Sequence, residues 1–196
     1  MALINRIIGG ALVGLMMLFA MGGAEAAEIN FTSQDAGSFV STDIDTDGDG
    51  STAIISTTAG QSNVGAINQQ MVIEVGATPT PNPACGAGQA GFPLVQATSV
   101  TSIRTQAADQ DGVTPPSTNA LLEARSVSGV ICGSDDLATS TYVLQMMITG
   151  GTGQFAGATG TLTVQGESKF LLLDTVGTPF GSMSNTVAGT VTTVGN

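Results

Sequence analysis

The chain has 196 residues and a formal net charge of −11, with four Lys and Arg residues against fifteen Asp and Glu residues. Binding to a phosphate backbone needs clustered basic side chains, so this composition excludes nucleic acid as a partner and also excludes electrostatic attachment to anionic lipid. Histidine and tryptophan are absent and glycine contributes 27 residues, which is typical of a β-protein with many tight turns.

The first 26 residues have the pattern of a signal peptide. Arg6 supplies a positive start, an apolar run covers residues 7–21, and small residues precede a cleavage point between Ala26 and Ala27. The run of about 15 residues is short for a membrane span of roughly 20, and an uncleaved anchor is the alternative. We therefore expect a signal peptide helix in residues 1–26, one domain over residues 27–196, and an exported protein, periplasmic or secreted, with no membrane attachment after cleavage.

Short β-prone runs follow the signal peptide, with turn residues between them and no convincing helical period. In chain order the runs are 28–33, 37–42, 52–57, 64–75, 92–104, 121–131, 141–148, 161–166, 169–173 and 183–194. The run 121–131 begins with LLEAR, which also favours a helix. Short connections imply antiparallel pairing, and closure of the sheet removes exposed edges. We predict an all-β fold, a single antiparallel closed barrel of about eight strands whose interior is packed or holds one small ligand.

The chain contains two cysteines, Cys85 and Cys132. In an exported protein we expect them to form one disulfide. Closing a loop of nearly fifty residues would stabilise the fold on the order of 4 kcal/mol in the chain-entropy model. A reactive thiol is the alternative, but the chain has no histidine to activate it.

A glycine-rich connection between two β-prone runs is the most informative segment. Its defining residues are Gly150, Gly151, Gly153, Phe155, Gly157 and Gly160. Glycine at this density marks positions of positive φ or close backbone approach, and the phenylalanine can anchor the loop in a core. Residues 151–156 also fit the dinucleotide pattern G-x-G-x-x-A, but that site needs a following helix, and β-prone residues follow here. We interpret the motif as structural.

The segment ITGGTGQFAGATGTLTV, residues 148–164, resembles the G-G-T-G-x-F-x-G-A-x-G signature of the allene oxide cyclase and dirigent-like β-barrel group, which is calycin-like. Bacterial secreted members of that group also have segments similar to residues 45–50, 91–95, 179–182 and 187–191. The resemblance implies an eight-stranded barrel but does not carry a mechanism across. A cyclase or isomerase that acts by orienting its substrate and excluding water is an alternative function compatible with it. No catalytic residue of those families aligns with a matching motif here, so we assign none.

Asp43, Asp45, Asp47 and Asp49 alternate, and with Gly48 they match the first half of an EF-hand loop. The twelfth position is Ile54 instead of a bidentate glutamate, so a weak calcium site and a solvated turn both remain open.

No other cofactor is expected, because zinc would need histidine or more cysteines. Glu74 and Glu123 lie between apolar residues and face either the lumen or solvent, with solvent favoured.

Three classes of function fit these observations. The first is an exported barrel without enzymatic activity that holds a small apolar ligand. The second is a cyclase or isomerase, and the third is a structural or adhesive extracellular protein with a weak calcium site. A homo-oligomer is compatible with each. Hydrolysis by a serine triad is excluded, because the chain has no histidine and no G-x-S-x-G motif.

Overall fold

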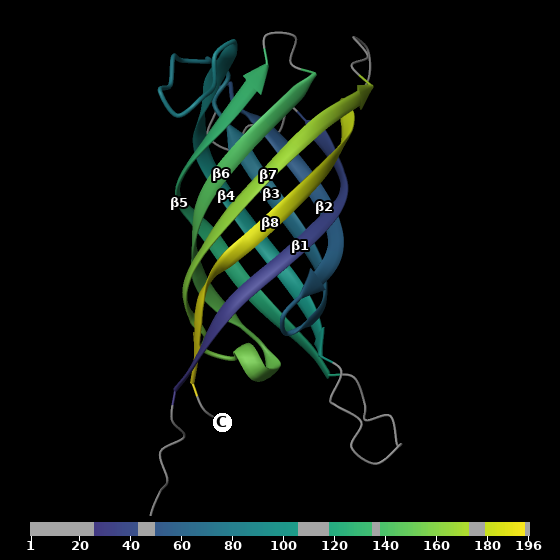
Figure 1. The fold of residues 1–196 in the computed structure, drawn as a ribbon, viewed down its shortest axis with the longest axis vertical. Helices are drawn as coiled ribbons and strands as arrows, with labels where there is room; N and C mark the ends of the chain where they lie inside the picture. The colour runs from purple at the N-terminus through teal and green to yellow at the C-terminus, as the bar shows by residue number, and fades with distance from the viewer. Residues whose placement is uncertain (1–25, 43–49, 106–117, 135–137, 173–178, 195–196) are drawn as a thin grey trace, which may run out of the picture.

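The computed structural model describes residues 26–42, 50–105, 118–134, 138–172 and 179–194. Most of the predicted signal peptide and the four aspartates of the candidate calcium site lie outside these ranges. Eight strands are present in chain order: β1 Ala27–Thr42, β2 Thr52–Ser62, β3 Gly65–Val75, β4 Gln89–Thr105, β5 Thr118–Ser134, β6 Thr139–Gly151, β7 Thr159–Leu172 and β8 Phe180–Thr193. Each strand pairs antiparallel with the next, and β1 pairs with β8, so the sheet is a closed barrel (Figure 1).

The predicted fold class is therefore confirmed, but two pairs of predicted runs are single strands. Runs 28–33 and 37–42 are both part of β1, and run 161–166 and residues 169–172 of run 169–173 both fall in β7. The residues between these runs, 34–36 and 167–168, are mostly polar, a composition typical of turns. The structure instead places Asp35 and Ser168 at buried positions of continuous strands. The helix tendency of LLEAR is overridden, because β5 pairs along its length with β4 and β6.

Alternation along the strands separates the lumen from the outer surface. In β6, Tyr142, Leu144, Met146 and Ile148 are buried, whereas the residues between them are exposed or half-buried. The same period-two pattern recurs in most of the other strands. In the part of the chain that the structure describes, no helix is long and apolar enough to span a membrane.

One end of the barrel is closed by the glycine-rich connection between β6 and β7. A single turn of 3-10 helix, η1 Gly153–Phe155, lies across this end (Figure 1). The side chain of Phe155 is fully buried and belongs to the hydrophobic core together with Phe31, Ile103 and Leu122. Gly153, Gly157 and Gly160 have positive φ, so the turn that delivers this phenyl ring needs glycine.

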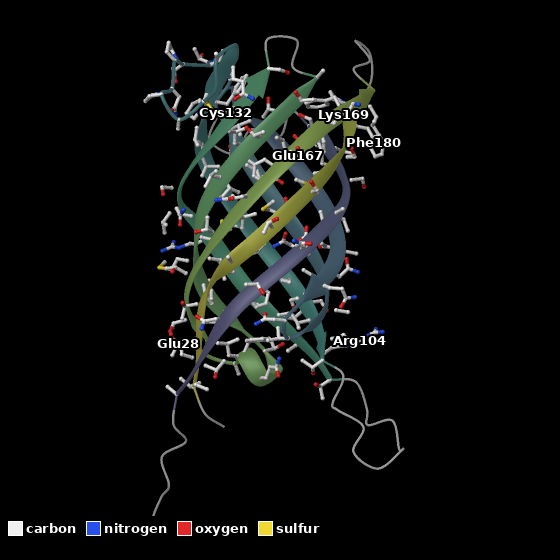
Figure 2. All side chains as sticks on the ribbon, in the orientation of Figure 1. Glu28, Arg104, Cys132, Glu167, Lys169 and Phe180 are labelled. Atoms are coloured by element: carbon white, nitrogen blue, oxygen red, sulfur yellow. A yellow bond between two sulfur atoms is a disulfide. The ribbon has the colours of Figure 1, made fainter. Side chains whose placement is uncertain are left out.

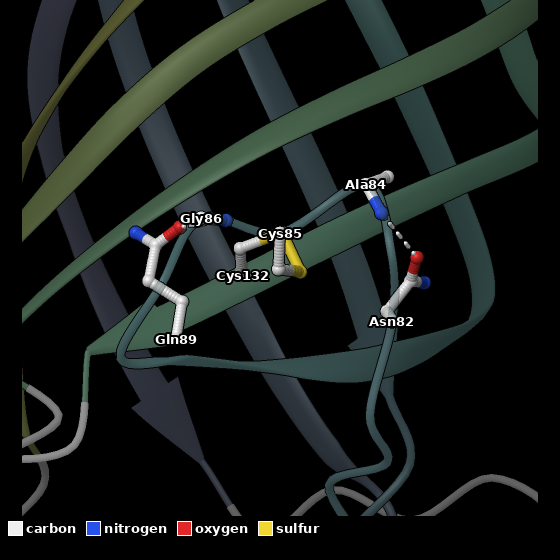
Figure 3. The surroundings of a disulfide bond; sticks show 6 residues. All are labelled: Asn82, Ala84, Cys85, Gly86, Gln89 and Cys132. Carbon is white, nitrogen blue, oxygen red and sulfur yellow. Dashed lines mark hydrogen bonds between the residues drawn. A yellow bond between two sulfur atoms is a disulfide. The ribbon is translucent and has the colours of Figure 1, made fainter.

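The predicted disulfide between Cys85 and Cys132 is present, with the two Cα atoms 5.5 Å apart. It joins the connection between β3 and β4 to the far end of β5 (Figure 3). That connection has an internal turn, in which the amide of Ala84 donates to Oδ1 of Asn82 at 3.0 Å. The disulfide therefore fixes an ordered loop to the rim of the barrel at the end opposite η1.

Candidate functional site

We call the end of the barrel opposite η1 the mouth. It contains a cavity of about 330 Å³ to which all eight strands or the residues beside them contribute. The lining residues are Ser41, Thr52, Ile54, Val75, Gly76, Ala77, Phe92, Ile131, Gly133, Thr139, Ser140, Phe170 and Pro179. A volume of this size lies at the lower end of the range for small-molecule sites.

The described lining of the mouth cavity is apolar with a few hydroxyl groups, and none of these described residues has a charged side chain. Ile54, Phe92 and Phe170 pack against the hydrophobic core but are only partly buried. The hydroxyls come from serine and threonine near the strand ends, and the Ser140 and Ser168 hydroxyls share a hydrogen bond with their oxygens 2.6 Å apart. The cavity can therefore bury an apolar molecule and offer it a hydrogen bond.

Buried side chains fill the lumen between the cavity and the middle of the barrel, and we call them the floor of the cavity. Phe39 is 1% exposed and meets Phe170 edge-to-face, with ring centroids 4.9 Å apart. Gly181 pairs with Phe39, and a Cβ on Gly181 would collide with the Phe39 ring, so glycine leaves room for it. Met183 is buried at the next inward position of β8.

Two of the strand irregularities lie at the mouth, whereas two others lie between β5 and β6, farther from it. The register of β3 and β4 shifts between Glu74 and Val75, and that of β7 and β8 shifts between Phe170 and Leu172. Bulges of this kind redirect side chains and are frequent beside binding sites. Here they occur where Val75 and Phe170 join the cavity lining.

A layer of buried polar side chains crosses the lumen beneath the floor. Tyr142, Gly166, Asn185 and Asp35 follow one another across the paired strands β6, β7, β8 and β1. The Tyr142 hydroxyl donates to Oδ1 of Asn185, and Nδ2 of Asn185 donates to Oδ1 of Asp35 at 2.7 Å. A Cβ on Gly166 would collide with the Tyr142 phenol, so the absence of a side chain there admits the ring.

Burial determines the protonation of this polar layer. Desolvation raises the pKa of the Asp35 carboxyl, and the neighbouring Thr58 hydroxyl and the Asn185 amide oppose that rise in part. Burial, together with the nearby Asp35 carboxylate, raises the pKa of the Tyr142 phenol above its usual value. The phenol therefore stays a neutral hydrogen-bond donor at neutral pH.

Three buried side-chain oxygens in the described residues have no hydrogen-bond partner: Ser33 Oγ, Asp35 Oδ2 and Thr58 Oγ1. Thr58 lies beside Asp35 but not in hydrogen-bonding geometry. All three residues are on β1 and β2 and at most 5% exposed. Buried polar groups are usually paired, so a bridging water would be expected here.

Glu74 corrects one expectation from the sequence. Alternation does place it opposite Ile73 and Val75, on the outer side of the wall, but it is 2% exposed and not solvent-facing. Its carboxylate accepts from Ser51 Oγ at 2.6 Å and from Gln96 Nε2 at 2.7 Å. These polar neighbours allow the carboxylate to be buried outside the lumen. Glu123 is exposed, as expected.

A wider depression of about 730 Å³ lies over the outer faces of β1, β7 and β8. Small or polar side chains such as Ala36, Gln165 and Thr186 line it. It faces solvent broadly and offers a ligand less apolar surface than the mouth cavity does. The mouth cavity is smaller but more enclosed, and we regard it as the better candidate site.

The residues singled out in the sequence lie at both ends of the barrel. The glycine motif lies at the closed end, whereas the disulfide stands beside the mouth, next to the lining residues Ile131 and Gly133. Figure 2 shows this separation, with Cys132 labelled at one end and Arg104 at the other. Among the described residues, no group of three or more His, Cys, Asp or Glu side chains is placed to hold a metal ion.

Sequence reasoning missed both the mouth residues and the polar layer. Phe92 and Phe170 gave the only usable signal for the mouth, as aromatic residues near the ends of predicted runs. Asp35 stood in a predicted break, and nothing in the sequence linked it to Asn185, 150 residues later.

The comparisons with known proteins add no family. No protein-family model matches the chain, and no significantly similar curated protein or solved structure was found. The function must be argued from the geometry of the barrel.

Proposed function

We propose that the protein is an exported barrel that binds a small apolar molecule in its mouth. The observation that carries this proposal is the cavity of about 330 Å³ whose described lining is largely apolar, at the end of the barrel opposite η1. An eight-stranded barrel has room for one small ligand in addition to its packed side chains.

The energetic support comes from the large apolar side chains left partly exposed in the lining. Ile54, Phe92 and Phe170 would complete their burial against a ligand. Full burial of such a side chain is worth roughly 1.5–3 kcal/mol, so completing a half-finished burial contributes about 1 kcal/mol per residue. Three such contacts contribute about 3 kcal/mol. Micromolar binding, at roughly −8 kcal/mol, also requires the ligand's own buried surface to supply the remainder and to offset the cost of association.

Export is supported by two separate features. The signal-peptide pattern ends next to Ala27, where β1 begins. The disulfide is compatible with an oxidising periplasmic or extracellular compartment.

A direct test uses a neutral fluorescent probe such as N-phenylnaphthylamine, titrated into the purified protein. Ile54→Trp fills the cavity from inside, and we expect it to weaken binding by at least about tenfold because the bulky ring takes the ligand's place. Ile55→Trp is the matched control, since Ile55 is the next residue of β2 and lies on the outer face, 36% exposed. Equal binding by both variants and the wild type would refute the mouth as the site.

A second candidate function, a cyclase or isomerase resembling the allene oxide cyclase and dirigent-like group, is favoured by one observation. On β6, the cavity-lining Ser140 is followed at the next inward position by Tyr142, which leads to Asn185 and Asp35. These groups could orient or protonate an intermediate if a ligand displaced the floor.

Binding and catalysis can be separated experimentally. A molecule recovered with the natively purified protein and identified by mass spectrometry would be incubated with the wild type and with Asp35→Asn. Catalysis requires that the wild type converts it and that the variant binds it without conversion. Recovery of the molecule unchanged from both would support binding alone.

A further inference from the structure

The mouth cavity also carries information about the charge of its ligand. Among the residues that the structure describes, the polar lining atoms are hydroxyl oxygens and main-chain groups, and no lining residue is Asp, Glu, Lys or Arg. An ionised ligand group placed there would lose its hydration without gaining an opposite charge. That loss is large for a carboxylate or an ammonium group, whereas a hydroxyl is compensated by one or two hydrogen bonds.

No described cation is placed to compensate an anionic ligand. Lys169 precedes the lining residue Phe170 in β7, but alternation turns its side chain to the outer surface, where it is exposed. Arg104 lies at the other end of the barrel (Figure 2), and Arg125 on β5 is exposed and does not line the cavity. The chain's net charge of −11 adds a long-range repulsion against anions.

Hydroxyl groups are distributed around the cavity. Ser41, Thr52 and Thr139 belong to three different strands, and each lines the cavity beside apolar neighbours. A single hydroxyl or carbonyl on an apolar ligand can therefore reach a partner from several orientations. The phenyl rings of Phe92 and Phe170 favour a flat ring as the apolar part.

We propose that the mouth cavity selects neutral molecules that combine an apolar, preferably cyclic body with one hydroxyl or carbonyl group, and that it rejects charged molecules with the same skeleton. This inference rests on the proposed ligand-binding function and adds the chemical class of the ligand.

The test compares four probes with one skeleton at neutral pH by calorimetry: methylnaphthalene, naphthylmethanol, naphthoate and naphthylmethylammonium. We expect naphthylmethanol to bind most tightly, and both ions to bind at least about tenfold more weakly because of unpaired desolvation. Tighter or equal binding of naphthoate would overturn the selectivity. Tightest binding of the ammonium probe would also overturn it, since the net negative charge of the chain would then decide affinity more strongly than the uncharged lining does.

If the protein does not bind apolar ligands in its mouth at all, the same four titrations give a different result. If methylnaphthalene and naphthylmethanol both fail to bind, the mouth is not an apolar site, and the ligand class falls with it. If they bind while the ions bind equally well, ligand binding stands and only the inferred class is wrong.

A charge-introducing pair of variants separates the lining from the net charge. Thr52→Lys places a cation in the lining, and Thr57→Lys places one on the exposed outer face of the same strand. We expect Thr52→Lys alone to raise naphthoate affinity by at least about tenfold, because it supplies the missing partner. Equal gains in both variants would show that net charge sets the selectivity, which contradicts the proposal. Unchanged thermal unfolding of both variants verifies that each is folded.

Discussion

The disulfide offers the sharpest test of how this barrel is stabilised. Replacing Cys85 and Cys132 together by serine removes the cross-link without leaving a free thiol. The two cysteines are 47 residues apart. In the chain-entropy model a closed loop of that length stabilises the folded state by about 4 kcal/mol at 25 °C, because it restricts the unfolded chain.

The folded barrel should survive the substitution. The loop that carries Cys85 keeps the hydrogen bond from the Gly76 amide to the Pro93 carbonyl at 2.9 Å. Thr80 and Gly91 also exchange two main-chain hydrogen bonds, at 2.8 and 3.0 Å. We therefore expect the loss to appear in the free energy of unfolding and not in the content of β-structure.

Urea unfolding followed by circular dichroism measures this loss. With a slope of about 2 kcal/mol/M, a loss of about 4 kcal/mol moves the midpoint down by about 2 M. Reduced wild type serves as the control and should unfold at the same midpoint as the double variant. A midpoint within about 0.5 M of the oxidised wild type, at an unchanged slope, would refute the argument from unfolded-chain entropy.

Three further substitutions probe the interior. Gly166→Ala should cost about 1–3 kcal/mol in urea unfolding, because its Cβ would collide with the Tyr142 phenol. Phe155→Ala should cost about 3–5 kcal/mol, because it leaves a cavity at the closed end. The raised pKa of Asp35 means that the folded state holds this proton more tightly than the unfolded state. Stability should therefore fall as pH rises from the unfolded towards the folded pKa of this group, and Asp35→Asn should flatten that dependence.

Matched controls accompany these variants. Gly150→Ala has its nearest foreign atom, an oxygen of Glu123, at 3.7 Å, so it should be well tolerated. Phe180→Ala removes a phenyl ring that is already 37% exposed and should cost less than Phe155→Ala. If each control variant lost as much unfolding free energy as its test variant, the packing arguments would be contradicted. A stability profile for Asp35→Asn that runs parallel to the wild type across acidic pH would contradict the assignment to Asp35.

The barrel could be predicted because period-two alternation and turn chemistry repeat along the chain, and each repetition constrains the same sheet. The alternation rule worked even at Glu74, which lies on the side of the wall that its neighbours dictate. Its burial could not be foreseen, because that depends on Ser51, just before β2, and on Gln96 in β4. A strand pattern specifies the face of a residue but not what covers it.

The candidate site depends on long-range closure, which local patterns do not contain. Asp35 interrupts an apolar alternation and therefore looked like part of a turn, yet pairing with β8 places it beside Asn185. The mouth poses a different difficulty. The pattern identifies Ile54 as inward-facing, but whether neighbouring side chains fill the space above it depends on all eight strand ends together.

The pairing of the first and last strands has a practical consequence. Ala27 is opposite Thr193, so both ends of the barrel domain leave from the side occupied by η1 (Figure 1). A purification tag, a surface tether or a fused partner protein joined directly before Ala27 or after Thr193 would start from the end of the barrel opposite the mouth cavity. Immobilised in this way, the barrel would turn its mouth towards the surrounding solution.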